Sequence, residues 1–266
     1  MKKIEALLID PQIDFCHPDG SLYVNGADQD MKRLAAFIKK NVRIFADINV
    51  TLDSHHLVDV AHPIFWRDSA GNNPQPFTII SAKDIQDGVW QPRIPSMHAR
   101  MLDYVRNLES SGRYPLCIWP PHCLIGSGGH NVVPELFDAL TTWERERFGM
   151  VNYVTKGSNI YTEHYSAIKA EVPDPNDPTT QLNTDLINKL LTADEILVAG
   201  EAGSHCVANT ALDICEAFGT DEYIKKIVLL TDAMSPVTGY ENNQDEFLDK
   251  IVSRGAKLTT TRDYAP

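Results

Sequence analysis

The chain has 266 residues, of which 43% are hydrophobic and 23% charged, and this composition is typical of a globular protein rather than a disordered one. Its net charge of −12 disfavours nucleic acid and acidic membrane surfaces as partners and fits a protein that acts on small molecules. No stretch approaches the roughly 20 apolar residues of a membrane span. We expect one domain over residues 1–266.

The cysteines indicate a reducing compartment. They are odd in number and scattered, with no paired spacing that would suggest a metal site; they are Cys16, Cys117, Cys123, Cys206 and Cys215. The first apolar run is interrupted by acidic residues within a few positions, which is too soon for a signal peptide. Reduced thiols and a cytoplasmic location are therefore expected.

Short apolar runs alternate with helical patterns along the chain. Strands are predicted at residues 4–9, 44–52, 116–119, 151–155, 196–199, 226–230 and 256–260. Helices are predicted at residues 28–40, 95–110, 134–148, 184–191 and 243–253, and a further helix begins near residue 206. This alternation predicts a doubly wound α/β fold in three Rossmann-like layers, with a mainly parallel sheet and helices on both faces.

Residues 67–114 do not fit this alternation. The segment has a Pro-rich and Asn-rich part at residues 72–77 and one helical pattern that begins after a proline and stops at Gly112. We expect it to be an insertion that packs over the core as a lid.

Polar residues with chemical potential follow several predicted strands. Asp10 follows the first strand, Asp53 and His55 follow the second, and Lys156 and Cys206 follow two later ones. In a doubly wound sheet these carboxyl ends share one crevice, where ligands bind. Asp53 and His55 are two residues apart, so their side chains point to the same side and can converge on one metal ion.

Cys206 is a candidate nucleophile because it lies in the first turn of a predicted helix. The positive end of a helix favours a thiolate, and its free N–H groups can hold the oxygen of an attacked carbonyl. Asp10 can accept the thiol proton, and Lys156 can stabilise the anion. Each residue also has a simpler interpretation: Cys206 as a buried core residue, Asp10 as a turn former and Lys156 as a surface charge.

Five motifs together carry a resemblance to a known family. They are residues 8–16 (LIDPQIDFC), 53–55 (DSH), 119–123 (WPPHC), 156–157 (KG) and 200–207 (GEAGSHCV). In this order they resemble the nicotinamidase branch of the isochorismatase-like cysteine hydrolases, and they span most of the chain. The resemblance implies an isochorismatase-like fold and a homo-oligomer.

The resemblance implies a role for each catalytic candidate. Cys206 attacks a carboxamide carbonyl, Asp10 accepts and returns a proton, and Lys156 stabilises the developing charge. A cis peptide bond between Glu201 and Ala202 is implied, with the N–H groups of Ala202 and Cys206 as the oxyanion hole. Two aromatic side chains are implied to flank the substrate ring; they are Phe15 and Trp119.

The resemblance also implies a metal site formed by Asp53, His55 and His122. A carboxylate with imidazoles suits a divalent ion, with zinc expected and iron or manganese as alternatives. His62 is a candidate fourth ligand, and His56 could replace it if the register differs, although a solvent-facing His56 is favoured. The neighbours Cys123 and His205 are expected to be structural.

The function expected from these features is a cytoplasmic, metal-containing cysteine amidohydrolase that converts nicotinamide to nicotinate and ammonia. Three positions depart from the family pattern: Ile13 where Asn is usual, Glu201 where an apolar residue is common and Ser204 where Asp is frequent. The long segment between His62 and His122 could also reshape the pocket. Another small amide or carbamoyl compound is therefore an alternative substrate, and a non-catalytic binding module is a further alternative.

Overall fold

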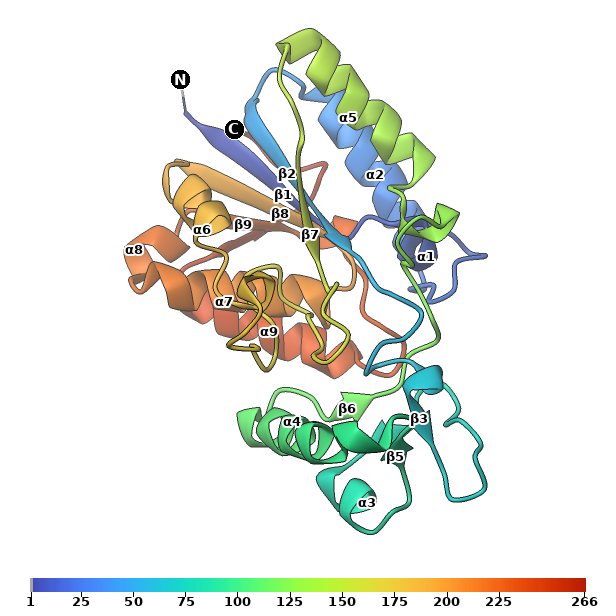
Figure 1. Cartoon of the computed structure of the whole chain (residues 1–266). Helices are drawn as coiled ribbons and strands as arrows, with labels where there is room; N and C mark the ends of the chain where they lie inside the picture. The colour runs from blue at the N-terminus through green and yellow to red at the C-terminus, as the bar shows by residue number, and fades with distance from the viewer. Residues whose placement is uncertain (1) are drawn as a thin grey trace.

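The computed structural model describes residues 2–266, which form a six-stranded parallel sheet between two layers of helices (Figure 1). The strand order is β10-β9-β8-β1-β2-β7, and every neighbouring pair is parallel. The strands are β1 (Ile4–Ile9), β2 (Phe45–Asp53), β7 (Asn152–Lys156), β8 (Glu195–Gly200), β9 (Ile227–Leu230) and β10 (Lys257–Thr259). This arrangement confirms the predicted doubly wound α/β fold.

Helices cover both faces of the sheet. One face is covered by α2 (Ala27–Lys40) and α5 (Pro134–Arg147), and the other by α6 (Thr184–Leu191), α7 (Cys206–Phe218) and α9 (Glu241–Ser253). The short helices α1 (Ile13–Cys16) and α8 (Asp221–Ile224) lie at loop ends. No helix within residues 2–266 has the length and apolar character needed to cross a membrane.

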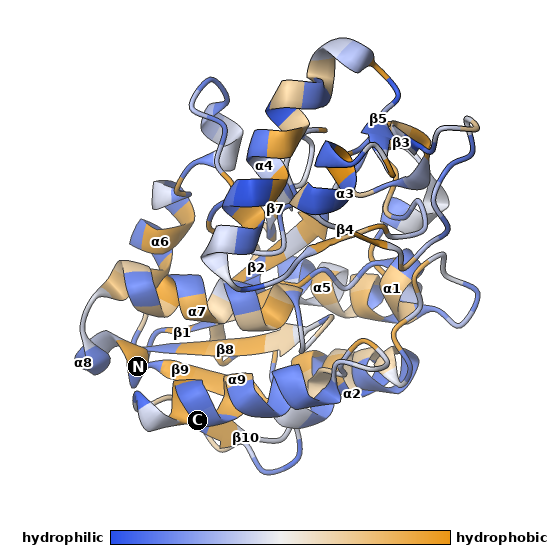
Figure 2. Cartoon of the chain, turned by 90° about the horizontal axis from the view of Figure 1, so that it is seen from below, coloured by the Kyte–Doolittle hydropathy of each residue, from blue (hydrophilic) through white to orange (hydrophobic). Residues whose placement is uncertain are grey.

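The two-sided burial explains why the central strands are continuous apolar runs. Side chains of a strand alternate between the two faces of a sheet. In β1, Ile4, Ala6 and Leu8 pack under α2 and α5, whereas Leu7 and Ile9 pack under α6 and α7. Figure 2 shows the strands as mainly hydrophobic ribbons between helices that carry hydrophilic residues on their outer faces.

Residues 63–118 form a separate layer with its own small core. It contains η1 (Pro63–Phe65), β3 (Trp66–Arg67), β4 (Ile79–Ile80), α3 (Ala82–Gln86), β5 (Gln91–Pro92), η2 (Pro95–Met97), α4 (His98–Ser111) and β6 (Leu116–Cys117). The strand predicted at residues 116–119 is shorter and lies outside the central sheet, because Leu116 pairs with Ile80 in an antiparallel two-stranded sheet. Figure 1 shows this layer, with α3 and α4, beyond the ends of the central strands.

The strand ends converge as expected. The register pairs Asp53 with Lys156 across β2 and β7, and Ile9 with Gly200 across β1 and β8. The short helical turns η3 (Gly128–His130), η4 (Pro178–Thr180) and η5 (Thr231–Ala233) lie in connecting loops. The edge of the sheet therefore gathers Asp10, Asp53, Lys156 and the turn that follows β8.

Gly200 makes the closest approach of β8 to β1. Its φ is +119°, and an added Cβ would lie 2.0 Å from the backbone oxygen of Ile9. We expect Gly200→Ala to reduce the free energy of unfolding by at least about 3 kcal/mol, because backbone strain and steric overlap add. Gly219→Ala is the matched control, since Gly219 has φ +70° but no neighbour within 4 Å of such a Cβ. Equal losses for the two variants in denaturant unfolding would contradict this prediction.

Candidate active site

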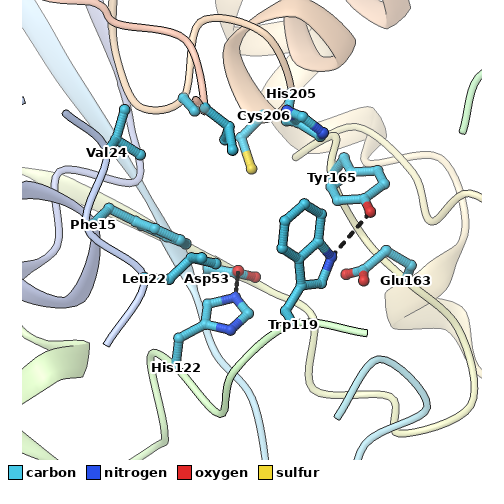
Figure 3. A pocket seen from close by; sticks show the side chains of 12 residues that line it. Phe15, Leu22, Val24, Asp53, Trp119, His122, Glu163, Tyr165, His205 and Cys206 are labelled. Carbon is cyan, nitrogen blue, oxygen red and sulfur yellow. Dashed lines mark hydrogen bonds and ion pairs between the residues drawn. The ribbon is translucent and has the colours of Figure 1, made fainter. Parts of the chain in front are cut away.

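A pocket lies at the carboxyl edge of the sheet, between the turn before α7 and the residues that follow β2 and β6 (Figure 3). It brings together Asp53 and Cys206 with the predicted aromatic residues Phe15 and Trp119. The full lining is Phe15, Leu22, Val24, Asp53, Trp119, His122, Glu163, Tyr165, Ala202, His205, Cys206 and Val237.

The turn between β8 and α7 places Cys206 as the first residue of its helix, as predicted. The peptide bond between Glu201 and Ala202 is cis, as the resemblance implies. The Ala202 carbonyl accepts hydrogen bonds from the N–H groups of His205, at 3.0 Å, and Val207, at 3.1 Å. Among residues 2–266, no acceptor is found for the N–H groups of Ala202 and Cys206. These two donors can therefore bind an oxygen of a ligand.

Lys156 connects the candidate catalytic groups. Its Nζ lies 2.9 Å from Oδ2 of Asp10 and 3.7 Å from Sγ of Cys206. It also lies 3.0 Å from Oδ1 of Asp53, and it donates a hydrogen bond to the carbonyl of His164 at 2.9 Å. Lys156 is 3% exposed, so it is not the surface charge of the simpler interpretation.

The charges of this cluster are set by burial and by each other. Burial alone would lower the pKa of Lys156, but Asp10 and Asp53 outweigh it and raise the pKa well above the usual value, so the ammonium stays protonated. Burial also raises the pKa of Asp10, although Lys156 opposes the change. A carboxyl group with a raised pKa gives a carboxylate that is a stronger base, and this suits a proton acceptor.

The expectation that the helix start favours a thiolate at Cys206 is not met in the resting site. Burial raises the pKa of the thiol well above its usual value, and the opposing effect of Lys156 does not cancel this. Asp10 raises it further, both by its charge and by a hydrogen bond with the thiol. The resting group is therefore a neutral thiol next to a base, and its proton must leave when the sulfur attacks.

Asp10 is oriented by a residue that the sequence analysis missed. The Thr51 hydroxyl donates a hydrogen bond to Oδ1 of Asp10 at 2.5 Å, and the Asp10 N–H approaches Thr51 Oγ1 at 3.0 Å. Thr51 lies on β2, next to β1, so its position at the site could be found only after the strand register was known.

A candidate metal site lies beside the catalytic cluster. One ligand atom from each of Asp53, His55 and His122 lies within 4.8 Å of the others, and all three side chains are buried. Nε2 of His55 lies 3.0 Å from Oδ2 of Asp53, and Nε2 of His122 lies 3.4 Å from the same oxygen. The structure thus brings together the three residues of the predicted metal set.

The opposite nitrogens of both imidazoles are held by acceptors. Nδ1 of His55 bonds to Oδ2 of Asp59 at 3.0 Å, and Nδ1 of His122 bonds to the Pro120 carbonyl at 2.8 Å. Both Nε2 atoms point towards Oδ2 of Asp53. Asp53 and Asp59 outweigh burial and raise the pKa of His55 well above its usual value, so without a metal this imidazole is protonated on both nitrogens, and a metal ion would take the place of the Nε2 proton. Asp59 was missed by the sequence analysis, although its spacing of four residues from His55 was a possible signal.

His62 is outside this set of three but close to it. Its ring lies 5.2 Å from that of His55 and 5.5 Å from that of His122, measured between centroids. Its Nδ1 lies 3.1 Å from the His56 carbonyl, and its buried Nε2 has no partner among residues 2–266. Burial lowers the pKa of His62 to about 4, so the imidazole is neutral and fits a fourth ligand. The side chain of His56 is exposed.

The pocket walls contain a further acid that the sequence analysis missed. Glu163 is 4% exposed, and burial, together with Asp59 and Asp53, raises the pKa of its carboxyl to about 8 although His55 opposes this. Trp119 donates a hydrogen bond to the Tyr165 hydroxyl at 3.2 Å, which fixes the ring beside Glu163 (Figure 3). No motif marked Glu163, because it lies in an irregular loop.

The two neighbours expected to be structural are both buried. His205 stacks on Tyr114 with 4.7 Å between ring centroids, and it also lines the pocket. Cys123 is completely buried, and its N–H donates a hydrogen bond to Oδ2 of Asp14 at 2.7 Å.

Solved structures with this fold include nicotinamidases and pyrazinamidases. A nicotinamidase/pyrazinamidase of Acinetobacter baumanii aligns with a TM-score of 0.63 at 19% sequence identity, over 99% of this chain and 98% of that chain. The yeast nicotinamidase bound to the inhibitor nicotinaldehyde aligns with a TM-score of 0.65 at 17% identity, over 97% and 99% of the two chains. A pyrazinamidase of Pyrococcus horikoshii in complex with zinc gives 0.58 at 18% identity, over 97% and 99%.

Comparison with protein-family models and with curated proteins gives no match. The likeness to the solved structures extends over nearly the whole chain. The chain therefore has the same α/β fold as these solved structures, in agreement with the fold that the resemblance implies.

Cys206 is the cysteine that lines the pocket, so its chemistry can be tested directly. We expect iodoacetamide to label Cys206 first and the four other buried cysteines only on unfolding. Because the pKa of the thiol is raised, the labelling rate should rise over a higher pH range than for a free cysteine. Lys156→Met should slow labelling at pH 8, since it removes the cation that opposes this shift. Peptide mapping by mass spectrometry identifies the labelled thiol, and first labelling elsewhere would contradict the prediction.

Proposed function

We propose that this chain is a metal-containing cysteine amidohydrolase of the isochorismatase-like superfamily, with nicotinamide as the leading substrate. The observation that carries the proposal is the contact of Lys156 with both Asp10 and Cys206, at the wall of a pocket beside an Asp-His-His cluster. The fold shared with nicotinamidases supports the same class of reaction.

In the first half of the proposed reaction, the Cys206 thiol gives its proton to the Asp10 carboxylate while its sulfur forms a bond to the amide carbon. The carbonyl oxygen becomes an oxyanion, to which the N–H groups of Ala202 and Cys206 donate. Asp10 then gives the proton to the amide nitrogen, the C–N bond breaks and ammonia leaves. A thioester on Cys206 is left.

In the second half, water hydrolyses the thioester. The Asp10 carboxylate takes a proton from the water as its oxygen bonds to the acyl carbon. The C–S bond then breaks, the sulfur takes the proton back from Asp10, and the carboxylic acid leaves. Lys156 remains protonated throughout, which agrees with its raised pKa, and stabilises both the thiolate and the carboxylate.

A metal ion in this enzyme would be held by Asp53, His55 and His122, with His62 as a fourth ligand. The Nε2 atoms of His55 and His122, which both point at Oδ2 of Asp53, and the unpartnered Nε2 of His62 fit such a role. Zinc suits this donor set, as do iron and manganese. When bound, the ion would supply a Lewis-acidic contact for a lone pair of the substrate, as the position of Asp53 and His122 in the pocket wall suggests.

One observation favours a different small amide or carbamoyl compound as a second candidate substrate. We propose that residues 67–114 act as a lid inserted in the single hydrolase domain. Phe77 from this segment is 58% exposed, and its ring packs edge-on against Trp119 with 5.9 Å between centroids. The lid thus reaches a pocket ring that would contact the substrate.

The reaction is tested by ammonia release from a panel of carboxamides that includes nicotinamide, pyrazinamide and carbamoyl compounds. We expect Cys206→Ala to lower the rate by about a thousandfold or more, and Asp10→Ala and Lys156→Ala to have effects of similar size. Cys215→Ala is the matched control, because Cys215 is also buried on α7 but does not line the pocket.

Two outcomes separate the mechanism from the substrate. Equal ammonia release by wild type and Cys206→Ala would contradict the mechanism, whereas hydrolysis of other amides but not nicotinamide would contradict the substrate alone. Nicotinaldehyde is a useful probe, since its carbonyl carbon can accept the Cys206 sulfur while the thiol proton moves to its oxygen. Inhibition of the wild type by this aldehyde, and lack of binding by Cys206→Ala, are the expected results.

Asp59 tests the metal site without any enzymatic assay. It orients His55 through a hydrogen bond of 3.0 Å. We expect Asp59→Ala to weaken binding of the metal by about 10–100-fold, as measured by competition with a chromophoric chelator. His56→Ala is the control and should bind the metal as the wild type does, because its side chain is exposed. Unchanged affinity in Asp59→Ala would contradict the assignment.

A further inference from the structure

Two buried carboxyl groups lie behind the turn that carries the candidate oxyanion donors. Glu201 of that turn is 0% exposed, and Asp30 of α2 is 3% exposed. Ser235 contacts both: its N–H donates to Oε2 of Glu201 at 3.0 Å, and its hydroxyl donates to Oδ2 of Asp30 at 2.5 Å. One serine therefore brings the two carboxyl groups together in the protein interior.

The charges around this pair do not balance if both acids are ionised. The guanidinium of Arg33 pairs with Oδ1 of Asp30 and also donates to the Asp232 carbonyl at 2.6 Å. Oε1 of Glu201 has no donor among residues 2–266. Two buried carboxylates next to one cation would leave an uncompensated charge, which is strongly unfavourable.

Ser235 also links this pair to the turn on both sides of Ala202. Its N–H bonds to Glu201, the residue before Ala202, and its carbonyl accepts the Gly203 N–H at 2.8 Å, directly after Ala202. The Glu201 N–H is in turn fixed to the Ile9 carbonyl of β1 at 2.8 Å. The position of the Ala202 N–H thus depends on Ser235 and on the groups that fix Ser235 in place.

We infer that Glu201 is a positioning residue, held as a carboxylic acid that donates a hydrogen bond to the Asp30 carboxylate and so fixes the turn bearing the Ala202 and Cys206 N–H groups. The effect of Glu201 on catalysis rests on the proposed function, whereas the protonation state of Glu201 does not. It also gives a reason for a carboxyl group at a position where an apolar residue is common in the related family.

The surroundings of Glu201 favour the protonated acid. Burial, followed by the charge of Asp30, raises the pKa of Glu201 well above its ordinary value, and a hydrogen bond between the two carboxyl groups acts in the same direction. Arg33 opposes the shift, and the Cys16 thiol of α1 is a further titratable group near Glu201. A carboxyl group whose pKa is raised in the folded state binds more protons there than in the unfolded chain. Its contribution to stability is therefore lost as the pH rises from the ordinary pKa of a glutamate towards the raised one.

Glu201→Gln and Glu201→Leu form a matched pair for the test. Gln keeps a donor for Asp30 and an acceptor for Ser235, whereas Leu has neither. We expect Glu201→Gln to keep kcat within about threefold of the wild type. We expect Glu201→Leu to lose about 10–100-fold in kcat with little change in KM, because the oxyanion donors would be misplaced while the pocket walls remain.

Two further measurements need no enzymatic activity. The wild type should lose stability to denaturant between pH 5 and pH 8 through Glu201, and Glu201→Gln should show a smaller loss over the same range. The rate of Cys206 alkylation at one pH should change at least threefold in Glu201→Leu and less in Glu201→Gln. Both measurements remain valid if the wild type hydrolyses no amide, so a failed proposed function is distinguishable from a failed inference.

The inference would be overturned by either of two results. One is the same pH dependence of stability in the wild type and Glu201→Gln, which would mean that Glu201 is ionised in the folded protein. The other is a Glu201→Leu variant with alkylation and turnover like those of Glu201→Gln, which would mean that the side chain only fills space. If Glu201→Leu does not fold, the comparison of the wild type with Glu201→Gln still decides the first result.

Discussion

The buried ammonium of Lys156 is the group on which the whole site depends. It lies between two acids, Asp10 at 2.9 Å and Asp53 at 3.0 Å, and removing the ammonium would leave both acids in the interior without the cation that they share. Asp10 belongs to the candidate catalytic half of the site and Asp53 to the candidate metal half. One cation therefore fixes the distance between the group that would attack the substrate and the groups that would hold a metal.

The parallel sheet makes this arrangement possible at low cost in chain entropy. Asp10, Asp53 and Lys156 end or directly follow three adjacent strands, and the register alone places Asp53 opposite Lys156. Their backbones are fixed by the hydrogen bonds of the sheet, so the ion pairs require only the side-chain rotamers to be ordered in addition. The turn after β8 adds Cys206 from the other side of β1. This geometry follows from the strand order and not from local sequence.

The sequence predicted the parts of the site that lie at strand ends or within short motifs. The sheet edge containing Asp10, Lys156 and Cys206 could be inferred because apolar runs and their polar terminal residues are local patterns. Thr51, Asp59 and Glu163 could not be found in this way, since their importance depends on register, on a loop conformation and on burial. The prediction of a thiolate at Cys206 was wrong for the same reason. Desolvation of the thiol is a property of the packed structure, and a position at a helix start does not by itself determine the pKa.

Three acids lie in the pocket region, namely Asp53, Asp10 and Glu163. Their surroundings shift their pKa values differently and so give them different chemical roles. Burial works to raise the pKa of Asp53, but His55 and Lys156 outweigh it and hold the pKa well below the usual range, so this acid is a carboxylate suited to a metal ion. Asp10 has one ammonium and one hydroxyl as partners, and burial prevails to give a stronger base. Among residues 2–266 no ion pair is formed by Glu163, and burial raises the pKa of its carboxyl to about 8. Opposed pKa shifts among neighbouring acids are a general way to assign different roles to identical functional groups.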